Sequence, residues 1–303
     1  MDLSVSIVSW NTRDLLQRCL ESVYGTIAGL EFEVLVVDNG STDGSPEMVR
    51  CEYPRATLLA NDANVGFARA NNQAIRASSG RHVLLLNSDA VLLGRAAELM
   101  VRFLDAHPEV GAVGGMLLNP DGSFQSSYAD FPELLGETLL LTGLSRWLLP
   151  ATYPSYPEAR SRETRPVDWV GGALLAARRQ TLDDVGLLDE GYFMYSEEVD
   201  WCYRMKERGW AIYYLPEVRA IHWLGASYGR VPARRRAQLY HSKCRFLRKH
   251  RGWLQAAAYG LLVRAVSAVK LLAWLPRELS LDPASRDRAR QQVASYRFLL
   301  ANF

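Results

Sequence analysis

Acidic residues stand at three places where a strand is expected to end or a helix to begin. Asp38 follows the apolar residues 34–37, Asp89 follows the apolar residues 83–86 with Asn87 and Ser88 between, and Glu197 lies in "YSEEVDW". An ionised carboxylate is costly to bury unless other groups compensate its charge. Because open α/β sheets bind ligands beyond the carboxyl ends of their strands, we expect Asp38 and Asp89 to face a ligand.

Each acidic site also has a purely structural interpretation. Asp38, in "VVDNGSTDGS", could form the local hydrogen bonds of a turn. Glu197, Glu198 and Asp200 could be first-turn carboxylates that the helix dipole favours. Three such sites in one chain favour a shared pocket.

Strand-like and helix-like segments alternate through residues 4–89. The hydrophobic pattern predicts strands over 4–10, 32–38, 56–62 and 81–89, and helices over 12–25, 45–53 and 66–80. A further strand is expected over 167–179, a turn leading into a helix over 193–210, and one or two strands over 211–223. This alternation is typical of βαβ units and predicts an α/β fold with a mainly parallel sheet.

Composition adds few constraints. The 303 residues are 49% hydrophobic and 22% charged, with a net charge of +2, as in an ordinary globular protein. The four cysteines form no CxxC pair, so neither a zinc site nor a disulfide framework is expected. The start "MDLSVSIVSWN" fits a first strand better than a signal peptide, and no uninterrupted apolar run reaches the length of a membrane span.

The C-terminal part of the chain is basic and amphipathic. Residues 219–277 contain no Asp or Glu, and Arg and Lys alternate there with aromatic and aliphatic residues. This composition is typical of a helix that lies in the plane of a membrane surface and is attracted by anionic lipid. Arg264 and Lys270 argue against a span, so we expect peripheral membrane association.

A series of motifs occurs in an order that resembles the family-2 inverting glycosyltransferases, particularly bacterial rhamnosyltransferases that act on lipid-linked or cell-wall glycans. The motifs are "SVSIVSWN", "VLVVDNGSTDGS", "NVGFARANNQAI", "LLLNSDA", "WVGGALLAARR", "FMYSEEVDWCYRMKERGW" and "HWLGAS". The resemblance covers residues 4–249, and the order of the motifs is far more specific than any one of them.

The resemblance implies a GT-A fold, which is a Rossmann-like sheet flanked by helices. It implies a catalytic domain over 1–228, with a nucleotide-binding part over about 1–118 and an acceptor-binding part over about 119–228. The basic, amphipathic helical region then occupies 229–303.

The resemblance also implies the donor and cation sites. Asp38 takes the place of the aspartate that contacts the nucleotide base. The other donor-binding residues are Ser9, Asn11, Asn64 and Asn87. The family's Asp-x-Asp metal motif stands here as Asn87-Ser88-Asp89, so Asp89 is the main charged ligand for Mg²⁺ or Mn²⁺, and His222 is a second ligand unless its role is structural. Such a cation would offset the charge that develops on a leaving diphosphate.

Catalytic and acceptor-binding residues follow from the same resemblance. The family's base is the second acid of a Glu-Asp pair, a position that Glu198 occupies here, with Glu197 as the rival. Trp169 and Gly172 would receive the acceptor sugar. Asp200 would either build the acceptor wall or form a salt bridge with Arg204 one helical turn away.

The expected reaction moves a sugar from a nucleoside diphosphate donor to a saccharide carried on a lipid, at the cytoplasmic face of the cell membrane. Rhamnose from dTDP-rhamnose is the first choice, and galactofuranose or an N-acetylhexosamine from a UDP-sugar is the alternative.

Three rival classes share parts of this pattern. A Rossmann dehydrogenase would need GxGxxG after the first strand, where "SWNTRDLL" stands, and a nucleotidyltransferase would need a basic glycine-rich loop. A nucleic-acid-binding protein could use the basic residues of 233–251. The apolar residues that follow fit a membrane surface better, so we expect no nucleic-acid partner.

Overall fold

The computed structural model describes residues 1–148, 158, 161–223 and 232–303. Its internal contacts divide these residues into two compact units, of which the first contains 1–131, 158, 161–193 and 197–223, and the second contains 132–148, 194–196 and 232–303. Two parts of the sequence patterns fall outside the described residues, namely "LGAS" at 224–227 and Arg230.

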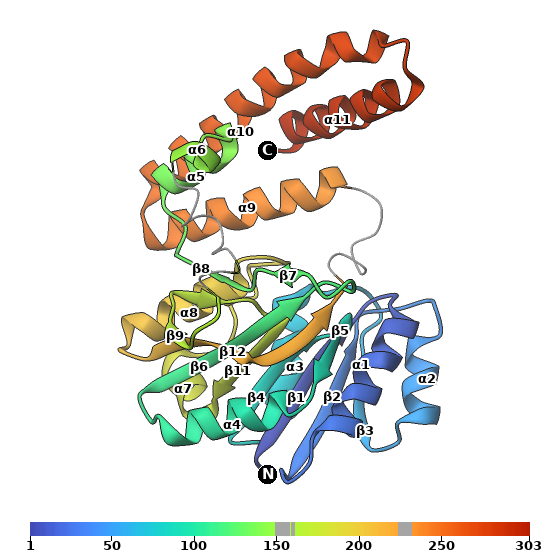
Figure 1. Cartoon of the computed structure of the whole chain (residues 1–303), viewed down its shortest axis with the longest axis vertical. Coiled ribbons are helices and arrows are strands. Elements are labelled where there is room, and N and C mark those ends of the chain that lie inside the picture. The colour runs from blue at the N-terminus through green and yellow to red at the C-terminus, as the bar shows by residue number, and fades with distance from the viewer. Residues whose placement is uncertain (149–157, 159–160, 224–231) are drawn as a thin grey trace. The chain divides into compact units, whose positions relative to one another are not determined.

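The first unit is built on a mixed, mainly parallel sheet (Figure 1). Its order is β3-β2-β1-β4-β11-β6-β12-β5, with β7 on β6 and β9 on β12, and β8 pairs separately with β10. The strands of the described residues are β1 (Leu3–Ser9), β2 (Phe32–Asp38), β3 (Ala56–Ala60), β4 (His82–Asn87), β5 (Ala90–Leu93), β6 (Val110–Leu118), β7 (Phe124–Gln125), β8 (Tyr128–Ala129), β9 (Arg165–Pro166), β10 (Trp169–Val170), β11 (Leu174–Arg178) and β12 (Ala211–His222).

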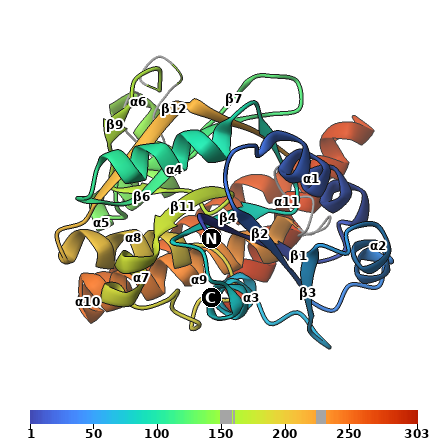
Figure 2. The same cartoon turned by 90° about the horizontal axis from the view of Figure 1, so that it is seen from below.

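Helices cover both faces of this sheet (Figure 2). One face carries α1 (Arg13–Thr26), α2 (Ser45–Glu52) and α4 (Ala96–Ala106), and the other carries α3 (Phe67–Ala77), α7 (Arg179–Val185) and α8 (Glu197–Glu207). In β4, Leu84 and Leu86 join the first core, whereas Val83 and Leu85 join the second. Because neighbouring side chains point to opposite faces, a strand buried on both faces is continuously apolar. The predicted α/β fold class is confirmed.

The carboxyl edge of the sheet brings the sequence-predicted polar residues together. β1 pairs in parallel with β2 and with β4, so that Ser9 lies opposite Asp38 and Val8 lies opposite Asn87. The chain order reverses between β1 and β4, which is the switch point where open α/β sheets bind ligands.

The second unit is helical. Its described helices are α5 (Leu134–Thr142), α6 (Ser145–Leu148), α9 (Pro232–His250), α10 (Trp253–Trp274), η2 (Leu275–Leu279) and α11 (Pro283–Asn302). Tyr259 and Val263 of α10 pack with Leu141 of α5, and Lys243 of α9 donates to both carboxylate oxygens of the buried Glu137, at 2.7 and 2.8 Å. The apolar insert of the sequence therefore packs with the C-terminal helices.

Two expectations about individual segments need correction. The strand expected over 167–179 is divided into β10 and β11 by Gly171 and Gly172. We also expected no segment capable of spanning a membrane. By length and composition alone, one helical segment in the described part of the chain passes that test: Trp253–Leu279 has a hydropathy of 1.5, because Arg264 and Lys270 are too few to outweigh its aliphatic residues.

Candidate active site

Asp38 occupies the carboxyl end of β2 with one carboxylate oxygen unused. Its Oδ2 accepts a hydrogen bond from the Ser41 backbone N–H at 2.8 Å, whereas the buried Oδ1 has no hydrogen-bond partner among the described residues. Buried acceptors are nearly always paired, so Asp38 Oδ1 is free to accept a hydrogen bond from a ligand. The N–H of a nucleotide base would satisfy it.

The loop that follows Asp38 is braced from β1 and α1. Asn11, at a φ of +52°, accepts from the Thr42 N–H at 2.8 Å, and Asp43 accepts from the Arg13 N–H at 2.8 Å. Asn11 therefore lies at the expected donor site, but its side-chain oxygen already holds the loop in place.

Two other expected donor-binding residues also have protein partners. The Ser9 side chain is fully buried and lies 3.1 Å from the Thr12 hydroxyl, which in turn lies 2.9 Å from that of Ser88. Asn64 Oδ1 accepts from the Gly66 N–H at 2.9 Å. The Ser9 hydroxyl supports the sheet edge through Thr12, and its contact with the donor stays a prediction.

Asn87, Asp89 and His222 form one cluster. His222 Nε2 lies 3.2 Å from Asp89 Oδ1 and 3.2 Å from Asn87 Nδ2. β12 brings the histidine here because it pairs with β5 in antiparallel register, placing His222 opposite Ala90, directly after Asp89. The Trp223 N–H donates to the Asp89 carbonyl at 2.9 Å, which fixes the two segments together.

This cluster suits a divalent cation. An imidazole nitrogen and a carboxylate oxygen are suitable ligands, and both side chains are at most 6% exposed. No group of three or more His, Cys, Asp or Glu residues in the described ranges could hold a metal ion. Mg²⁺ is commonly bound by one or two carboxylates and completed by substrate phosphates, so a small protein ligand set fits a cation that arrives with a nucleotide.

Glu197 and Glu198 begin α8 as an acid pair, in which Glu197 is buried and Glu198 is half-buried. Oε2 of each is buried with no hydrogen-bond partner within the described residues. Desolvation, and then the neighbouring Glu198 charge, raises the pKa of Glu197 well above its usual value. Desolvation also raises the pKa of Glu198 to about 7, although the backbone N–H groups of Glu198 and Val199 act in the opposite direction. A carboxylate with a pKa near 7 is suited to proton transfer.

Gly172 links this acid pair to the end of β4. A Cβ at Gly172 would lie 3.8 Å from Glu198 Cβ and 3.3 Å from the Phe67 ring. The next residue, Ala173, accepts from the Asn87 N–H at 3.2 Å. The segment beside Glu198 therefore pairs with the residue that opens the Asn-Ser-Asp triplet, and both lie in the first unit.

Trp169 and Asp200 have mainly structural surroundings. The Trp169 indole N–H donates to the Asp130 carbonyl at 2.9 Å. Asp200 is fully buried, and its Oδ2 accepts from Arg204 Nε at 2.9 Å. The salt bridge with Arg204, one of the two interpretations of Asp200, is present, whereas its contact with the acceptor stays a prediction.

Sequence reasoning missed the polar residues that support the site. Gln125 contacts His222, and Asn39 is 2% exposed and accepts from Asn61 Nδ2 at 3.0 Å. Gln125 lies in a polar segment rich in turn residues, where the sequence gives no signal for it. Asn39 directly follows Asp38, and that adjacency to a candidate ligand contact was an available signal.

The fold is that of the GT-A glycosyltransferases. It is similar to a mannosyltransferase from Pyrobaculum calidifontis in complex with GDP-Man and Mn²⁺, with a TM-score of 0.55 and 21% identity over 99% of this chain and 86% of that one. It is also similar to GalNAc-T7 with UDP, GalNAc and Mn²⁺, with a TM-score of 0.54 and 16% identity over 73% of this chain and 44% of that one.

Sequence comparison defines the family. Residues 4–186 match the model of glycosyl transferase family 2. The chain is 31% identical over 267 residues to N-acetylglucosaminyl-diphospho-decaprenol L-rhamnosyltransferase of Mycobacterium tuberculosis, which covers 84% of this chain and 87% of the relative. It is 22% identical to rhamnosyltransferase WbbL of Escherichia coli, over 72% of this chain and 82% of the relative. The protein belongs to glycosyl transferase family 2.

Proposed function

We propose that this glycosyltransferase moves rhamnose from dTDP-rhamnose to a lipid-linked saccharide, with inversion at the anomeric carbon and with a divalent cation. The name of the mycobacterial relative, which is similar along 84% of this chain, supports both the rhamnosyl donor and an acceptor of the N-acetylglucosaminyl-diphospho-polyprenol type. The reaction class rests on one observation: Glu197 and Glu198, each with a buried and unpaired Oε2, lie beside the segment that joins the Asn87 end of β4.

In this proposal, successive parts of the sequence bind the donor, the acceptor and the membrane. Residues 1–118 bind the donor, 119–228 contribute acceptor contacts, and 229–303 engage the membrane. Asp38 Oδ1 accepts from the base of the nucleotide, and Trp169 and Gly172 border the space for the acceptor sugar. A side chain at Gly172 would crowd the Phe67 ring, which a Cβ there would approach to 3.3 Å, so glycine keeps the backbone close to Phe67 and Glu198.

Asp89 and His222 are the residues that would hold the cation. A bound Mg²⁺ or Mn²⁺ supplies positive charge to the diphosphate as it leaves. Asn87, the first member of the triplet, contributes a neutral amide where the Asp-x-Asp pattern has a second carboxylate.

Glu198 is the base. An acceptor hydroxyl forms a new bond to the anomeric carbon while its proton moves to Glu198, and the bond from that carbon to the diphosphate oxygen breaks, so the nucleoside diphosphate leaves with the electron pair. The carboxylate must be ionised before the step, and its pKa of about 7 provides both an ionised fraction near neutral pH and enough basicity. Burial, and then the Glu198 charge, raise the pKa of Glu197 well above its usual value, which favours the protonated form of Glu197.

A calorimetric titration tests the donor specificity. The probes are dTDP, UDP, dTDP-rhamnose and UDP-sugars, each measured with Mn²⁺ and then with chelator. Selective, Mn²⁺-dependent binding of dTDP and dTDP-rhamnose supports the proposal. Preference for UDP compounds would favour the alternative donors, galactofuranose or N-acetylhexosamine, and absence of binding to every compound would contradict the proposed donor site.

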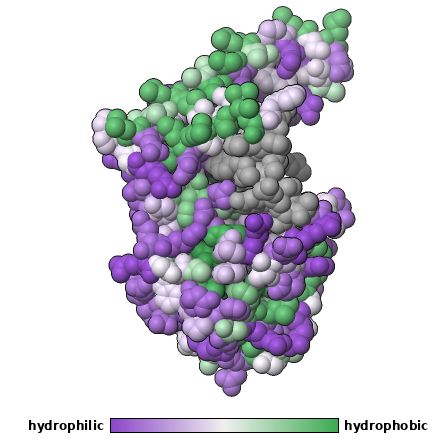
Figure 3. All heavy atoms as spheres, turned by 60° about the vertical axis from the view of Figure 1, so that its left-hand side comes forward, coloured by the Kyte–Doolittle hydropathy of each residue, from purple (hydrophilic) through white to green (hydrophobic). Residues whose placement is uncertain are grey.

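The second unit supports peripheral membrane association. α10 buries Ala256, Tyr259 and Val263, and leaves a second, mainly apolar face open. The large hydrophobic residues exposed in this unit are Leu135, Leu144, Trp147, Leu148, Trp253, Leu254, Leu261, Val269, Leu272, Leu279 and Leu281. Figure 3 shows how hydrophobic side chains crowd this unit. Exposed apolar surface on this scale is typical of protein or membrane interaction sites.

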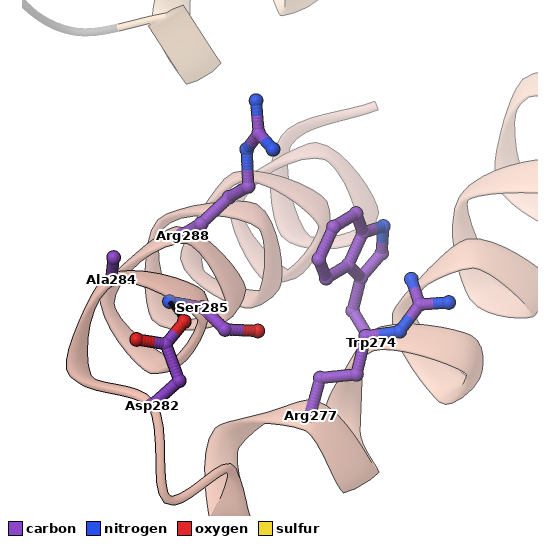
Figure 4. Close-up of a pocket in the computed structure, with 6 residues that line it drawn as sticks. All are labelled: Trp274, Arg277, Asp282, Ala284, Ser285 and Arg288. Atoms are coloured by element: carbon purple, nitrogen blue, oxygen red, sulfur yellow. Dashed lines mark hydrogen bonds between the residues drawn. The ribbon is translucent and has the colours of Figure 1, made fainter.

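Basic and aromatic groups accompany this apolar surface. Arg277 lies over the Trp274 ring, 4.6 Å from its centroid, at the end of α10. Both line a pocket of about 550 Å³ with Arg288, Ser285, Asp282 and Ala284 (Figure 4). Tryptophan beside arginine is typical of the headgroup level of a bilayer, where anionic lipid attracts the cation. We therefore propose that this unit holds the enzyme at the cytoplasmic membrane face.

A further inference from the structure

We propose that Gln125 is a positioning residue that fixes the tautomer of His222, so that the imidazole presents the lone pair of Nε2 toward Asp89. This inference rests on the proposed cation site of Asp89 and His222. Gln125 lies on the short strand β7, outside every motif of the donor and catalytic sites.

The orientation of the Gln125 amide follows from its neighbours. Its Nε2 donates to the His222 backbone carbonyl at 3.2 Å and to Asn119 Oδ1 at 2.8 Å. A backbone carbonyl can only accept, so the atom facing it must be the amide nitrogen. The other amide atom, Oε1, then faces the His222 ring.

The Asn119 amide supports the same assignment. Its Nδ2 donates to the Ser123 hydroxyl at 2.9 Å and to the Phe124 carbonyl at 3.5 Å. Its oxygen is therefore the atom left to accept from Gln125. The backbone carbonyls of His222 and Phe124 thus determine the orientation of the Gln125 and Asn119 side-chain amides, which are hydrogen-bonded to each other.

This orientation determines which imidazole nitrogen carries the proton. Gln125 Oε1 lies 2.6 Å from His222 Nδ1, and because Oε1 can only accept, Nδ1 must donate. In the neutral imidazole the other nitrogen, Nε2, then holds a lone pair. That lone pair can accept from Asn87 Nδ2 at 3.2 Å and also lies 3.2 Å from Asp89 Oδ1. A cation bound between Nε2 and Asp89 Oδ1 would take the place of the Asn87 donor.

Hydrogen bonding to the remote nitrogen is the usual way in which proteins orient a metal-binding histidine. Loss of such an outer partner typically weakens metal affinity 10–100-fold. Gln125 also holds the His222 backbone through Nε2, so it fixes both the ring and the strand that carries it. Its role is therefore to position His222 without touching the substrate.

Four variants separate this role from general support of the fold. Gln125→Leu removes the acceptor, Gln125→Glu keeps an acceptor for Nδ1–H, and His222→Ala removes the ring. The matched control is Gln17→Leu, because Gln17 bonds to Glu52 on the exposed surface between α1 and α2. Circular dichroism melting of the full-length proteins verifies folding.

Two readouts apply to each variant. The first is the tautomer of His222 in the protein without metal, from long-range ¹H–¹⁵N NMR, with the signal assigned by its loss in His222→Ala. The second is the affinity for Mn²⁺ in the presence of dTDP, from electron paramagnetic resonance of free Mn²⁺. We expect the Nδ1–H tautomer in the wild type and in Gln125→Glu, and a mixed or reversed tautomer in Gln125→Leu. The Mn²⁺ affinity should fall roughly 10–100-fold in Gln125→Leu and by less in Gln125→Glu.

The outcomes distinguish the inference from the proposed function. If Gln125→Leu keeps both the wild-type tautomer and the wild-type Mn²⁺ affinity while His222→Ala loses affinity, the cation site stands and the role of Gln125 is overturned. If His222→Ala binds Mn²⁺ as the wild type does, the cation site itself is wrong, and the role of Gln125 toward it is overturned with it.

Discussion

His222 Nε2 lies 3.2 Å from Asp89 Oδ1, although His222 ends β12 and Asp89 lies in the turn between β4 and β5, far away in the chain. The antiparallel pairing of β12 with β5 creates this relationship. It brings together an imidazole and a carboxylate at the edge of the sheet where Asp38 keeps an unused acceptor. The predictions below follow from these contacts and from the acid pair of α8.

Asp89→Ala should weaken Mn²⁺-dependent binding of dTDP at least tenfold, because it removes the charged ligand. Asn87→Asp should strengthen it, because a second carboxylate completes an Asp-x-Asp pattern beside the same imidazole. Calorimetry with Mn²⁺ and with chelator measures both effects. Equal affinities of the wild type and Asp89→Ala under both conditions would mean that the triplet is not a cation site.

The pH dependence of transfer should reflect the ionisation of Glu198. Its carboxylate must be ionised to accept a proton, so kcat/KM should rise as the pH increases through about 7 and then level off. The measurement is the initial rate at saturating Mn²⁺ from pH 5.5 to 8.5. A rate that is constant over this range would contradict the assignment of Glu198 as the base.

Burial of Glu197 should make the protein less stable as the pH rises. The folded state retains a proton on Glu197 at pH values where the unfolded chain has released it, so the stabilisation present below the usual pKa of 4.5 is lost as the pH rises toward the raised folded value. Glu197→Gln should therefore raise the Tm at pH 8 by at least about 2 °C and change it little at pH 4.5.

The control for this measurement is Glu47→Gln, which alters an exposed carboxylate paired with Arg50. It should leave the pH dependence of the Tm as in the wild type. A Glu197→Gln protein with the wild-type Tm at every pH would show that Glu197 is not held protonated in the folded state.

The sheet and its edge could be predicted from the sequence because they depend on local patterns. Strands buried on both faces are continuously apolar, and Asp38 and Asp89 end two of them. The support for His222 could not be predicted, because Gln125 reaches it only through the pairing of β7, β6 and β12. The role of Asp200 could not be predicted either, because the periodicity of a helix does not show what each face packs against. Here Arg204, the partner of Asp200, donates to the backbone carbonyls of Val185 and Leu187.

The exposed apolar residues of the C-terminal unit could be predicted only in part. The sequence marks Phe246, Leu247 and Tyr259 as members of the apolar series, yet all three are fully buried. Leu247 and Tyr259 belong to the core between helices, as side chains at helical spacing often do. The exposed series on α10, with Leu254, Leu261 and others, becomes visible only once the packing is known.

Combined Leu254→Ser, Leu261→Ser and Leu272→Ser substitutions should weaken sedimentation with vesicles roughly tenfold or more, because each removes apolar area from the membrane contact. Arg277→Gln with Arg288→Gln should weaken binding to anionic vesicles only, whereas Arg50→Gln, on α2, is the control and should have no effect. Binding of the wild type to duplex DNA but to no vesicle would replace the membrane proposal with nucleic-acid binding.

The most direct test of the account compares Glu198→Gln with the wild type in two measurements on the same preparations. One is transfer from dTDP-rhamnose to an N-acetylglucosaminyl-diphospho-polyprenol acceptor with Mn²⁺, and the other is the affinity for dTDP with Mn²⁺. We predict that the wild type forms a product of inverted anomeric configuration, and that Glu198→Gln lowers kcat at least about 100-fold, in the range of a lost general base, with nearly unchanged dTDP affinity. A Glu198→Gln protein that retains most of the transfer activity would contradict the account.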